Sequence, residues 1–160
     1  MIRAIVAIDE KQGIAKHGFQ PWYIPEDDQY FSDQTKQYGG NVLMGQRTFE
    51  IIGEPLAGRH NYVLTRNPGA DSRVEYVTDL TSFLSQFEVQ GRDMWVIGGA
   101  SVYAQTLQDV DELYITRIQA DFGCDQFFPE FVPSFGLRQA GEQQEQNGFR
   151  FRFEVYSRLT

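Results

Sequence analysis

The chain has 160 residues, of which 41% are hydrophobic and 14% aromatic, so it can bury the core of one globular domain. Its formal net charge of −8 argues against a nucleic-acid-binding surface, and no apolar run is long enough to cross a membrane. The lone cysteine, Cys124, excludes an internal disulfide and suits a reducing compartment, and the first residues lack a signal-like pattern. We therefore expect a single domain over residues 1–160 and a cytoplasmic location.

Strands and helices alternate along most of the chain. A near-continuous apolar run predicts a central strand buried on both faces at residues 2–8, and buried strands are also expected at 41–44 and 94–97. Further strands are expected at 61–65, 74–77 and 112–119. Helices are expected at 26–37, 48–52, 80–87 and 101–107, and a loop at 9–25. Strict alternation over 149–156 predicts an antiparallel strand with one wet face, paired with 135–140. The fold class is therefore α/β, with a mostly parallel sheet and antiparallel C-terminal strands.

The segment from Pro21 to Asp27 leads from an extended, proline-fixed loop into the first helix. Asp27 lies one helical turn before Phe31 and two before Thr35, so the three side chains share a face. Phe31 and the preceding Trp22 suggest that this face is buried, where an unpaired carboxylate is costly. Asp27 is therefore a candidate functional acid, against the simpler interpretation of a solvated acid at a helix start.

Three polar groups follow the ends of predicted strands, at residues 45–48, 65–67 and 98–101. Ligands of open α/β sheets bind beyond the carboxyl ends of the strands. Gly98-Gly99 allows a close backbone approach, and the guanidinium groups of Arg47 and Arg66 could each hold a phosphate. Each feature alone is more often a turn or a solvated charge, but together they favour a dinucleotide. The common G-x-G-x-x-G fingerprint is absent.

Five motifs occur in the order and spacing of bacterial dihydrofolate reductases, and the chain resembles that family over essentially its whole length. The motifs are Pro21-Trp22-x-x-Pro25-x-Asp27, Met44-Gly45-x-x-Thr48-Phe49-Glu50-x-Ile52-Gly53, Pro55-Leu56-x-Gly58-Arg59, Val96-Ile97-Gly98-Gly99-Ala100-x-Val102-Tyr103 and Phe127-Phe128-Pro129. The resemblance implies an eight-stranded, mostly parallel sheet flanked by four helices. It also implies a monomer that reduces 7,8-dihydrofolate to tetrahydrofolate with NADPH and binds antifolates.

On the substrate side, the resemblance implies that Asp27 anchors the pterin, with Thr116 and Trp22 completing the catalytic set. Arg59 would pair with the α-carboxylate of the folate tail. The implied substrate-binding residues are Ile5, Ala7, Asp27, Asp28, Phe31, Ile52, Leu56, Arg59, Ile97, Tyr103 and Thr116. Hydride would pass to pterin C6 and a proton to N5, with charged Asp27 stabilising the protonated pterin while water delivers the proton.

On the cofactor side, the resemblance implies a nicotinamide pocket, a pyrophosphate site and a 2′-phosphate site that favours NADPH. The implied residues are Ala7, Ile14, Gly45, Gln46, Arg47, Thr48, Leu64, Thr65, Arg66, Gly98, Gly99, Ala100, Ser101, Val102 and Tyr103. The loop at residues 9–25 would act as a lid that contacts residues 123–125. No metal site is expected, because the only histidines are His17 and His60.

Two departures from the family pattern concern the binding site. Asp28 stands where the family usually has an apolar residue, so it either turns to solvent or alters substrate and antifolate selectivity. Gln46 replaces a frequent phosphate-binding arginine. Two other functions stay open: a related pyrimidine reductase of riboflavin synthesis, and a nucleotide- or folate-binding module without turnover.

Overall fold

The computed structural model describes all 160 residues and contains one large sheet. Nine strands form this sheet, in the order β10-β11-β7-β1-β6-β3-β4-β5, with β9 also paired with β11. Their bounds are β1 Ile2–Ile8, β3 Asn41–Gly45, β4 His60–Leu64, β5 Glu75–Val77, β6 Met94–Gly98, β7 Glu112–Ile118, β9 Phe135–Ala140, β10 Gln144–Gln146 and β11 Phe149–Arg158. Because β9 and β10 pair with different ends of β11, the strands fill eight positions across the sheet, which agrees with the prediction.

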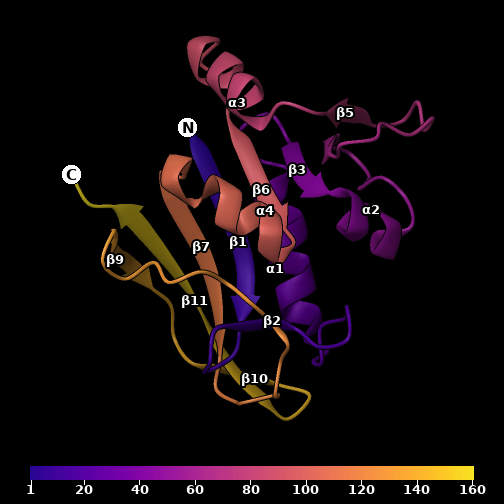
Figure 1. Cartoon of the computed structure of the whole chain (residues 1–160). Coiled ribbons are helices and arrows are strands. Elements are labelled where there is room, and N and C mark those ends of the chain that lie inside the picture. Colours follow the sequence, from indigo (N-terminus) through magenta and orange to yellow (C-terminus); the bar gives the residue numbers. More distant parts are fainter.

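The middle of the sheet is parallel. Strand β1 lies between β6 and β7, and all seven of its residues are buried, as its continuous apolar sequence predicts. The parallel pairing continues through β3, β4 and β5, while β11 runs antiparallel to β7, β9 and β10. In Figure 1, β1 runs downward from the N-terminus, so the carboxyl ends of the parallel strands lie at the lower end of the view.

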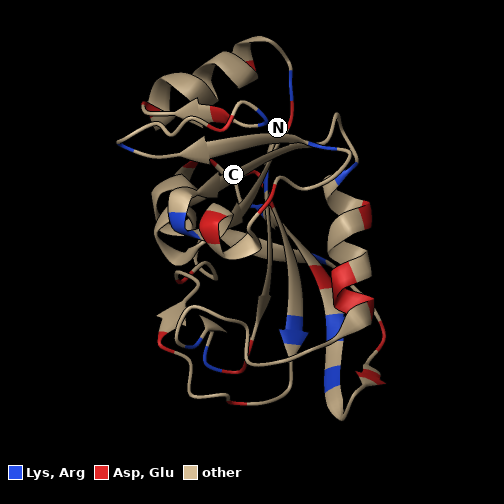
Figure 2. Cartoon of the chain, turned by 90° about the vertical axis from the view of Figure 1, so that its right-hand side faces the viewer, with Lys and Arg blue, Asp and Glu red and all other residues tan.

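Four helices cover the two faces of the sheet (Figures 1 and 2). Helices α1 (Pro25–Thr35) and α2 (Gln46–Ile52) pack on one face, against a core that includes Ile5, Trp95 and Ile97. Helices α3 (Leu80–Val89) and α4 (Ala100–Thr106, continued by a 3₁₀ turn, Leu107–Asp109) pack on the other face, in the largest core cluster. No helix has both the length and the apolar character needed to span a membrane.

The structure corrects the sequence prediction in two places. Residues 9–25 are not a continuous loop, because β2 (Gly13–Ala15) pairs antiparallel with β8 (Gln126–Phe127) in a small second sheet. Strands of two or three residues are too short for a periodic pattern to reveal them. The polar side of β11 is also not simply wet, because Glu154 is 1% exposed and is held by charged and hydroxyl donors.

Candidate active site

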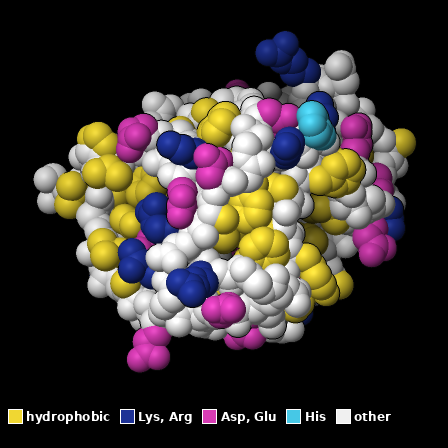
Figure 3. Space-filling model, turned by 90° about the horizontal axis from the view of Figure 1, so that it is seen from below, with side chains coloured by type: hydrophobic (Ala, Val, Ile, Leu, Met, Phe, Trp, Pro, Cys, Tyr) yellow, Lys and Arg dark blue, Asp and Glu magenta, His cyan; other side chains and the backbone are white.

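A cleft of about 1240 Å³ opens toward the carboxyl ends of the parallel strands. Its walls come from β1, from the ends of β3, β4 and β6, from Thr116 on β7, and from helices α1, α2 and α4. Figure 3 views this lower end of the molecule and shows hydrophobic side chains gathered between charged ones. The cleft therefore lies where the strand order predicted a ligand site.

Most of the predicted site residues line this one cleft. They are Ile5, Ala7, Ile14, Asp27, Asp28, Phe31, Gly45, Gln46, Arg47, Thr48, Ile52, Leu56, Leu64, Thr65, Arg66, Ile97, Gly99, Ala100, Ser101, Val102, Tyr103 and Thr116. Trp22, Arg59 and Gly98 are not among its lining residues. Segments that lie far apart in sequence thus meet at one surface.

Asp27 is the most enclosed acid of the cleft. It stands in the first turn of α1 and is only 8% exposed. The hydroxyl of Thr116 on β7 donates a hydrogen bond to its Oδ1 over 2.5 Å. Thr35, two turns further along the same helix face, is fully buried, as the spacing of Asp27, Phe31 and Thr35 predicted. The expected carboxylate on a buried helix face is therefore present.

The environment of Asp27 favours its neutral form. Burial raises the pKa of Asp27 to about 6, and the negative charge of Asp28 adds to the rise, while the Thr116 hydrogen bond opposes it. No arginine or lysine forms an ion pair with Asp27. Asp28 lines the same cleft but is exposed, and partial desolvation raises the pKa of its own carboxyl.

Tyr103 on α4 closes the floor of the cleft. It is buried, and its hydroxyl donates a hydrogen bond to the carbonyl oxygen of Ile5 over 2.6 Å. The backbone of Gly98 runs directly over this ring: a Cβ there would lie 3.1 Å from it, and the φ of Gly98 is +116°. A side chain at this turn would strain the backbone and press on the Tyr103 ring, so the turn requires glycine.

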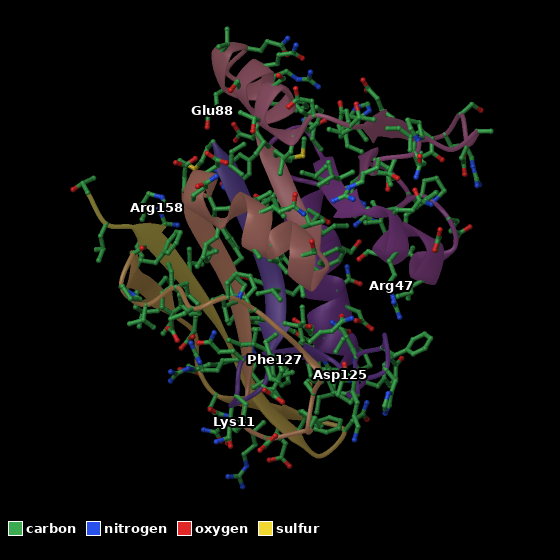
Figure 4. All side chains as sticks on the ribbon, viewed as in Figure 1. Lys11, Arg47, Glu88, Asp125, Phe127 and Arg158 are labelled. Carbon is green, nitrogen blue, oxygen red and sulfur yellow. The ribbon has the colours of Figure 1, made fainter.

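Two arginines supply the positive charge of the cleft. Arg47 is an exposed residue in the first turn of α2, and Arg66 lies two residues after β4. Neither guanidinium makes a hydrogen bond or an ion pair within the protein. Figure 4 shows Arg47 extending from α2 toward the loop below it. Gln46 also lines the cleft, and its buried Oε1 has no hydrogen-bond partner. The two free guanidinium groups can donate to the oxygens of a phosphate-bearing ligand. The Gln46 oxygen is an acceptor, so it can only take a hydrogen bond from a donor such as a ribose hydroxyl.

Trp22 and Arg59 support the cleft from outside its lining. Trp22 is 7% exposed and packs on Phe122, with ring centroids 5.1 Å apart, and its indole N–H has no hydrogen-bond partner. Arg59 donates from Nη1 to the hydroxyl of Thr35 over 2.8 Å and from Nε to the carbonyl of Ala57 over 3.0 Å. These two bonds hold the guanidinium beside the C-terminal turn of α1.

The segment at residues 9–25, called below the segment over the cleft, is tied to the loop at residues 121–125. Asp9 is fully buried, and its carboxylate accepts hydrogen bonds from the backbone N–H groups of Gly13 (2.7 Å) and Phe122 (3.1 Å). Gly13 packs so tightly on Cys124 that a Cβ there would lie 2.4 Å from the cysteine Cβ. Asp125 accepts from the backbone N–H of His17 over 3.0 Å. Asp9 was not among the predicted residues, because Phe122 and Cys124, which hold it against the second loop, lie more than 100 residues further along the chain.

Several further residues line the cleft besides the predicted substrate- and cofactor-binding residues. Gly18, Phe19 and Gln20 come from the loop predicted as a lid, whereas Ile51 from α2 and Thr78, Asp79 and Leu80 were not predicted. The last three directly follow the carboxyl end of β5. The strand at 74–77 was predicted, but the residues after its carboxyl end were not considered as part of the ligand site, although the same rule applies to them.

Comparison with known proteins agrees with this geometry. The family model described as dihydrofolate reductase matches residues 1–158. This chain belongs to the dihydrofolate reductase family. The dihydrofolate reductase of Bacillus subtilis (strain 168) is 34% identical over 163 residues, covering 99% of this chain and 95% of the relative. The dihydrofolate reductase type 3 of Salmonella typhimurium is also 34% identical over 163 residues, covering 99% and 98%.

A solved structure extends the similarity to the fold. The dihydrofolate reductase from Enterococcus faecalis, complexed with NADP(H) and RAB-propyl, superposes with a TM-score of 0.87. It is 31% identical in sequence, and the match covers 100% of this chain and 97% of that one. The dihydrofolate reductase family thus accounts for the whole sheet and for all of the segments that line the cleft.

Proposed function

We propose that this protein reduces 7,8-dihydrofolate to 5,6,7,8-tetrahydrofolate with NADPH as the cofactor, and that the whole chain is one reductase domain. The observation that carries the proposal is Asp27, a buried carboxylate without a cationic partner, in a cleft that also holds two unpaired arginines. Such a cleft can bind one ligand with hydrogen-bond donors and a second ligand with phosphates. Membership of the family supports the same pairing.

The substrate end of the cleft would be formed by β1, α1 and β7. Asp27 would accept hydrogen bonds from the 2-amino group and N3 of the pterin, with its orientation fixed by the Thr116 hydroxyl. Ile5, Ala7, Phe31, Ile97 and Tyr103 would line the slot, and Ile52 and Leu56 would pack on the aminobenzoyl ring. Asp28 lies at the exposed edge of this slot. Antifolates would occupy the same slot.

Arg59 would bind the α-carboxylate of the substrate tail. Because its hydrogen bond to Thr35 comes from Nη1 and its bond to Ala57 from Nε, its Nη2 makes no hydrogen bond within the protein. Burial lowers the pKa of Arg59, which is the direction expected where no carboxylate accompanies the charge. A substrate carboxylate would supply the missing counter-charge.

The cofactor would lie along α2, α4 and the ends of β3 and β4. Ala7 and Ile14 would receive the nicotinamide carboxamide. Arg47 and Thr48, with Gly99 to Val102, would hold the pyrophosphate, and Tyr103 would lie beside the nicotinamide. Thr65 and Arg66 would take the 2′-phosphate and the adenine, with Gly45, Gln46, Leu64 and Gly98 completing the cofactor site. The unpaired guanidiniums could donate to the phosphates of this ligand, and the orphaned Oε1 of Gln46, an acceptor, could take a hydrogen bond from a ribose hydroxyl. When bound, NADPH supplies the hydride.

Asp27 and Trp22 would assist the transfer of a proton to N5 of the pterin. The product gains hydrogen at C6 and N5, and charged Asp27 would stabilise the pterin protonated at N5, with water delivering the proton. The unpartnered indole N–H of Trp22 is a buried donor that can hold such a water. The segment over the cleft, tied down by Asp9 and Asp125, would exclude bulk water from the reaction.

Loss of NADPH absorbance on adding dihydrofolate to the purified protein tests the proposal directly. We expect turnover that decreases at high pH, because protonation at N5 then becomes limiting. Thr116→Val removes the hydroxyl that orients Asp27 and should lower turnover. Thr116→Ser, which keeps the hydroxyl, is the matched control. NADPH binding without any oxidation would instead favour the binding-module hypothesis, and turnover of a pyrimidine substrate in place of dihydrofolate would favour the riboflavin-pathway reductase.

A further inference from the structure

Asp79 is a third carboxylate in the cleft, besides Asp27 and Asp28. Asp27 and Asp28 belong to the first turn of α1, at the end where the substrate is placed. Asp79 follows β5, at the opposite end, together with Thr78 and Leu80. The mechanism proposed above gives it no role.

The sheet places Asp79 beside Arg66. Strands β4 and β5 pair in parallel with Leu64 opposite Val77, and the backbone N–H of Thr65 donates to the carbonyl of Val77 over 2.9 Å. Arg66 and Asp79 each stand two residues beyond that pair, on neighbouring strands spaced about 4.8 Å apart. The carboxylate and the guanidinium therefore flank the same end of the cleft, although they form no ion pair.

The orientation and charge of Asp79 are fixed by local bonds. It is the N-cap residue of α3: the backbone N–H of Ser82 donates to Oδ1 over 3.1 Å, and the Ser82 hydroxyl donates to Oδ2 over 3.0 Å. These hydrogen bonds lower the pKa of Asp79, so it stays ionised near neutral pH. No cation neutralises it.

We propose that Asp79 is a cofactor-specificity residue, which opposes a phosphate on the adenosine ribose and so limits the preference of this enzyme for NADPH over NADH. The inference rests on the proposed function. NADPH differs from NADH by a 2′-phosphate monoester, which carries about two negative charges at neutral pH. Repulsion from the fixed carboxylate acts on that phosphate alone, whereas a ribose 2′-hydroxyl can donate a hydrogen bond to it. Arg66 attracts the phosphate that Asp79 repels.

Asp79→Asn separates charge from structure, because asparagine is as good an N-cap as aspartate. We expect the ratio of kcat/KM for NADPH to kcat/KM for NADH to rise about three- to tenfold at low salt, mainly through a lower KM for NADPH. The gain should shrink at high salt, since the charges are exposed to solvent. Arg66→Gln should move the ratio in the opposite direction.

Asp71→Asn is the matched control. Asp71 is also an aspartate held by local bonds, from Arg73, but it does not line the cleft, so its substitution should leave the ratio unchanged. A second measurement needs no turnover: calorimetric binding of adenosine 2′,5′-bisphosphate and of 5′-AMP to the wild type and to the Asp79→Asn variant. The variant should gain affinity for the bisphosphate only.

An unchanged cofactor ratio, or equal gains for both nucleotides, would overturn the role of Asp79. A lack of dihydrofolate reduction with either cofactor would instead refute the proposed function. The two failures are distinguishable, because the nucleotide-binding comparison does not depend on dihydrofolate.

Discussion

Two buried carboxylates on opposite faces of the same sheet show what separates a structural acid from a functional one. Asp27 is 8% exposed and Glu154 is 1% exposed. Glu154 on β11 accepts hydrogen bonds from Arg117 (2.8 Å), Arg152 (2.7 Å) and the Tyr156 hydroxyl (2.9 Å). Asp27 accepts one bond, from Thr116, and has no cation beside it. The two acids are similarly buried but very differently compensated.

The pKa values of the two groups diverge accordingly. Burial raises the pKa of Glu154, but the hydrogen bonds from Arg117 and Tyr156 and the charges of Arg117 and Arg152 outweigh burial, so the pKa lies below its usual value. Burial raises the pKa of Asp27 to about 6 because little opposes it. Asp27 thus keeps unused capacity to accept hydrogen bonds inside the cleft, where a ligand can use it.

Asp27→Asn should give the largest change in activity. The amide cannot stabilise a cationic pterin, so dihydrofolate turnover near neutral pH should fall by about a hundredfold or more. NADPH binding, measured by fluorescence titration, should be unaffected. Because Asn can still accept the Thr116 hydrogen bond, the variant should fold normally. Near-normal turnover would contradict the role given to Asp27.

Glu154→Gln should produce the opposite outcome. The amide leaves Arg117 and Arg152 without their carboxylate, and we expect the free energy of unfolding to fall by about 2 kcal/mol, since both arginines are partly exposed. The kcat/KM of the folded variant should stay within about twofold of the wild type, because Glu154 faces away from the cleft. Urea denaturation and steady-state kinetics measure the two quantities. A loss of turnover in a fully folded variant would mean that the contrast with Asp27 is wrong.

The pH dependence of stability should distinguish the two carboxylates as well. The folded-state pKa of Asp27, about 6, is raised, so the folded state binds this proton more tightly than the unfolded state does. The cost of ionising Asp27 is therefore absent in acid, develops between about pH 4 and pH 6, and persists above pH 6. Asp27→Asn should remove this cost and stabilise the protein by about 3 kcal/mol near neutral pH.

Glu154 has the opposite sign. Its folded-state pKa is lowered, so its stabilising contribution is present above the unfolded pKa and is lost as the pH falls through the folded value. Denaturation midpoints of the wild type and both variants, measured across the acid range, provide the test. Equal midpoints for the wild type and Asp27→Asn near neutral pH would show that Asp27 is not destabilising when ionised.

The sequence pattern correctly predicted that Asp27 is buried but wrongly predicted that Glu154 is solvated, for related physical reasons. Asp27 could be identified locally, because helical spacing places it with Phe31 and Thr35 on one face. The alternating pattern of β11 predicted a solvated side for Glu154, yet Arg117 from the neighbouring strand and Tyr156 enclose it. Partners on another strand are not visible in a local pattern. Asp9 was missed for the same reason, since Phe122 lies far along the chain.

The fold was more predictable than the details of the cleft. Runs rich in apolar residues located both ends of every parallel strand to within one residue, which is inside the usual uncertainty of strand ends. The small sheet formed by β2 and β8 was missed, because its strands contain too few residues for a pattern. The position of Asp79 beside Arg66 likewise depends on the pairing of β4 with β5, which no local sequence feature specifies.

Asp28→Asn should give the smallest effect and makes the comparison sharpest. The charge of Asp28 raises the pKa of Asp27, and its removal should lower that pKa toward the ordinary value, because a like charge disfavours ionisation. The acid limb of the pH–rate profile should move to lower pH at low salt and return at high salt, since Asp28 is exposed. Loss of repulsion should also lower the KM for dihydrofolate, whose tail is anionic, by about two- to threefold.

Glu26→Gln is the matched control, because Glu26 also adjoins Asp27 but does not line the cleft. If both variants shifted the profile equally, the effect would come from the net charge of α1. Asp28 would then have no specific influence on the pKa of Asp27.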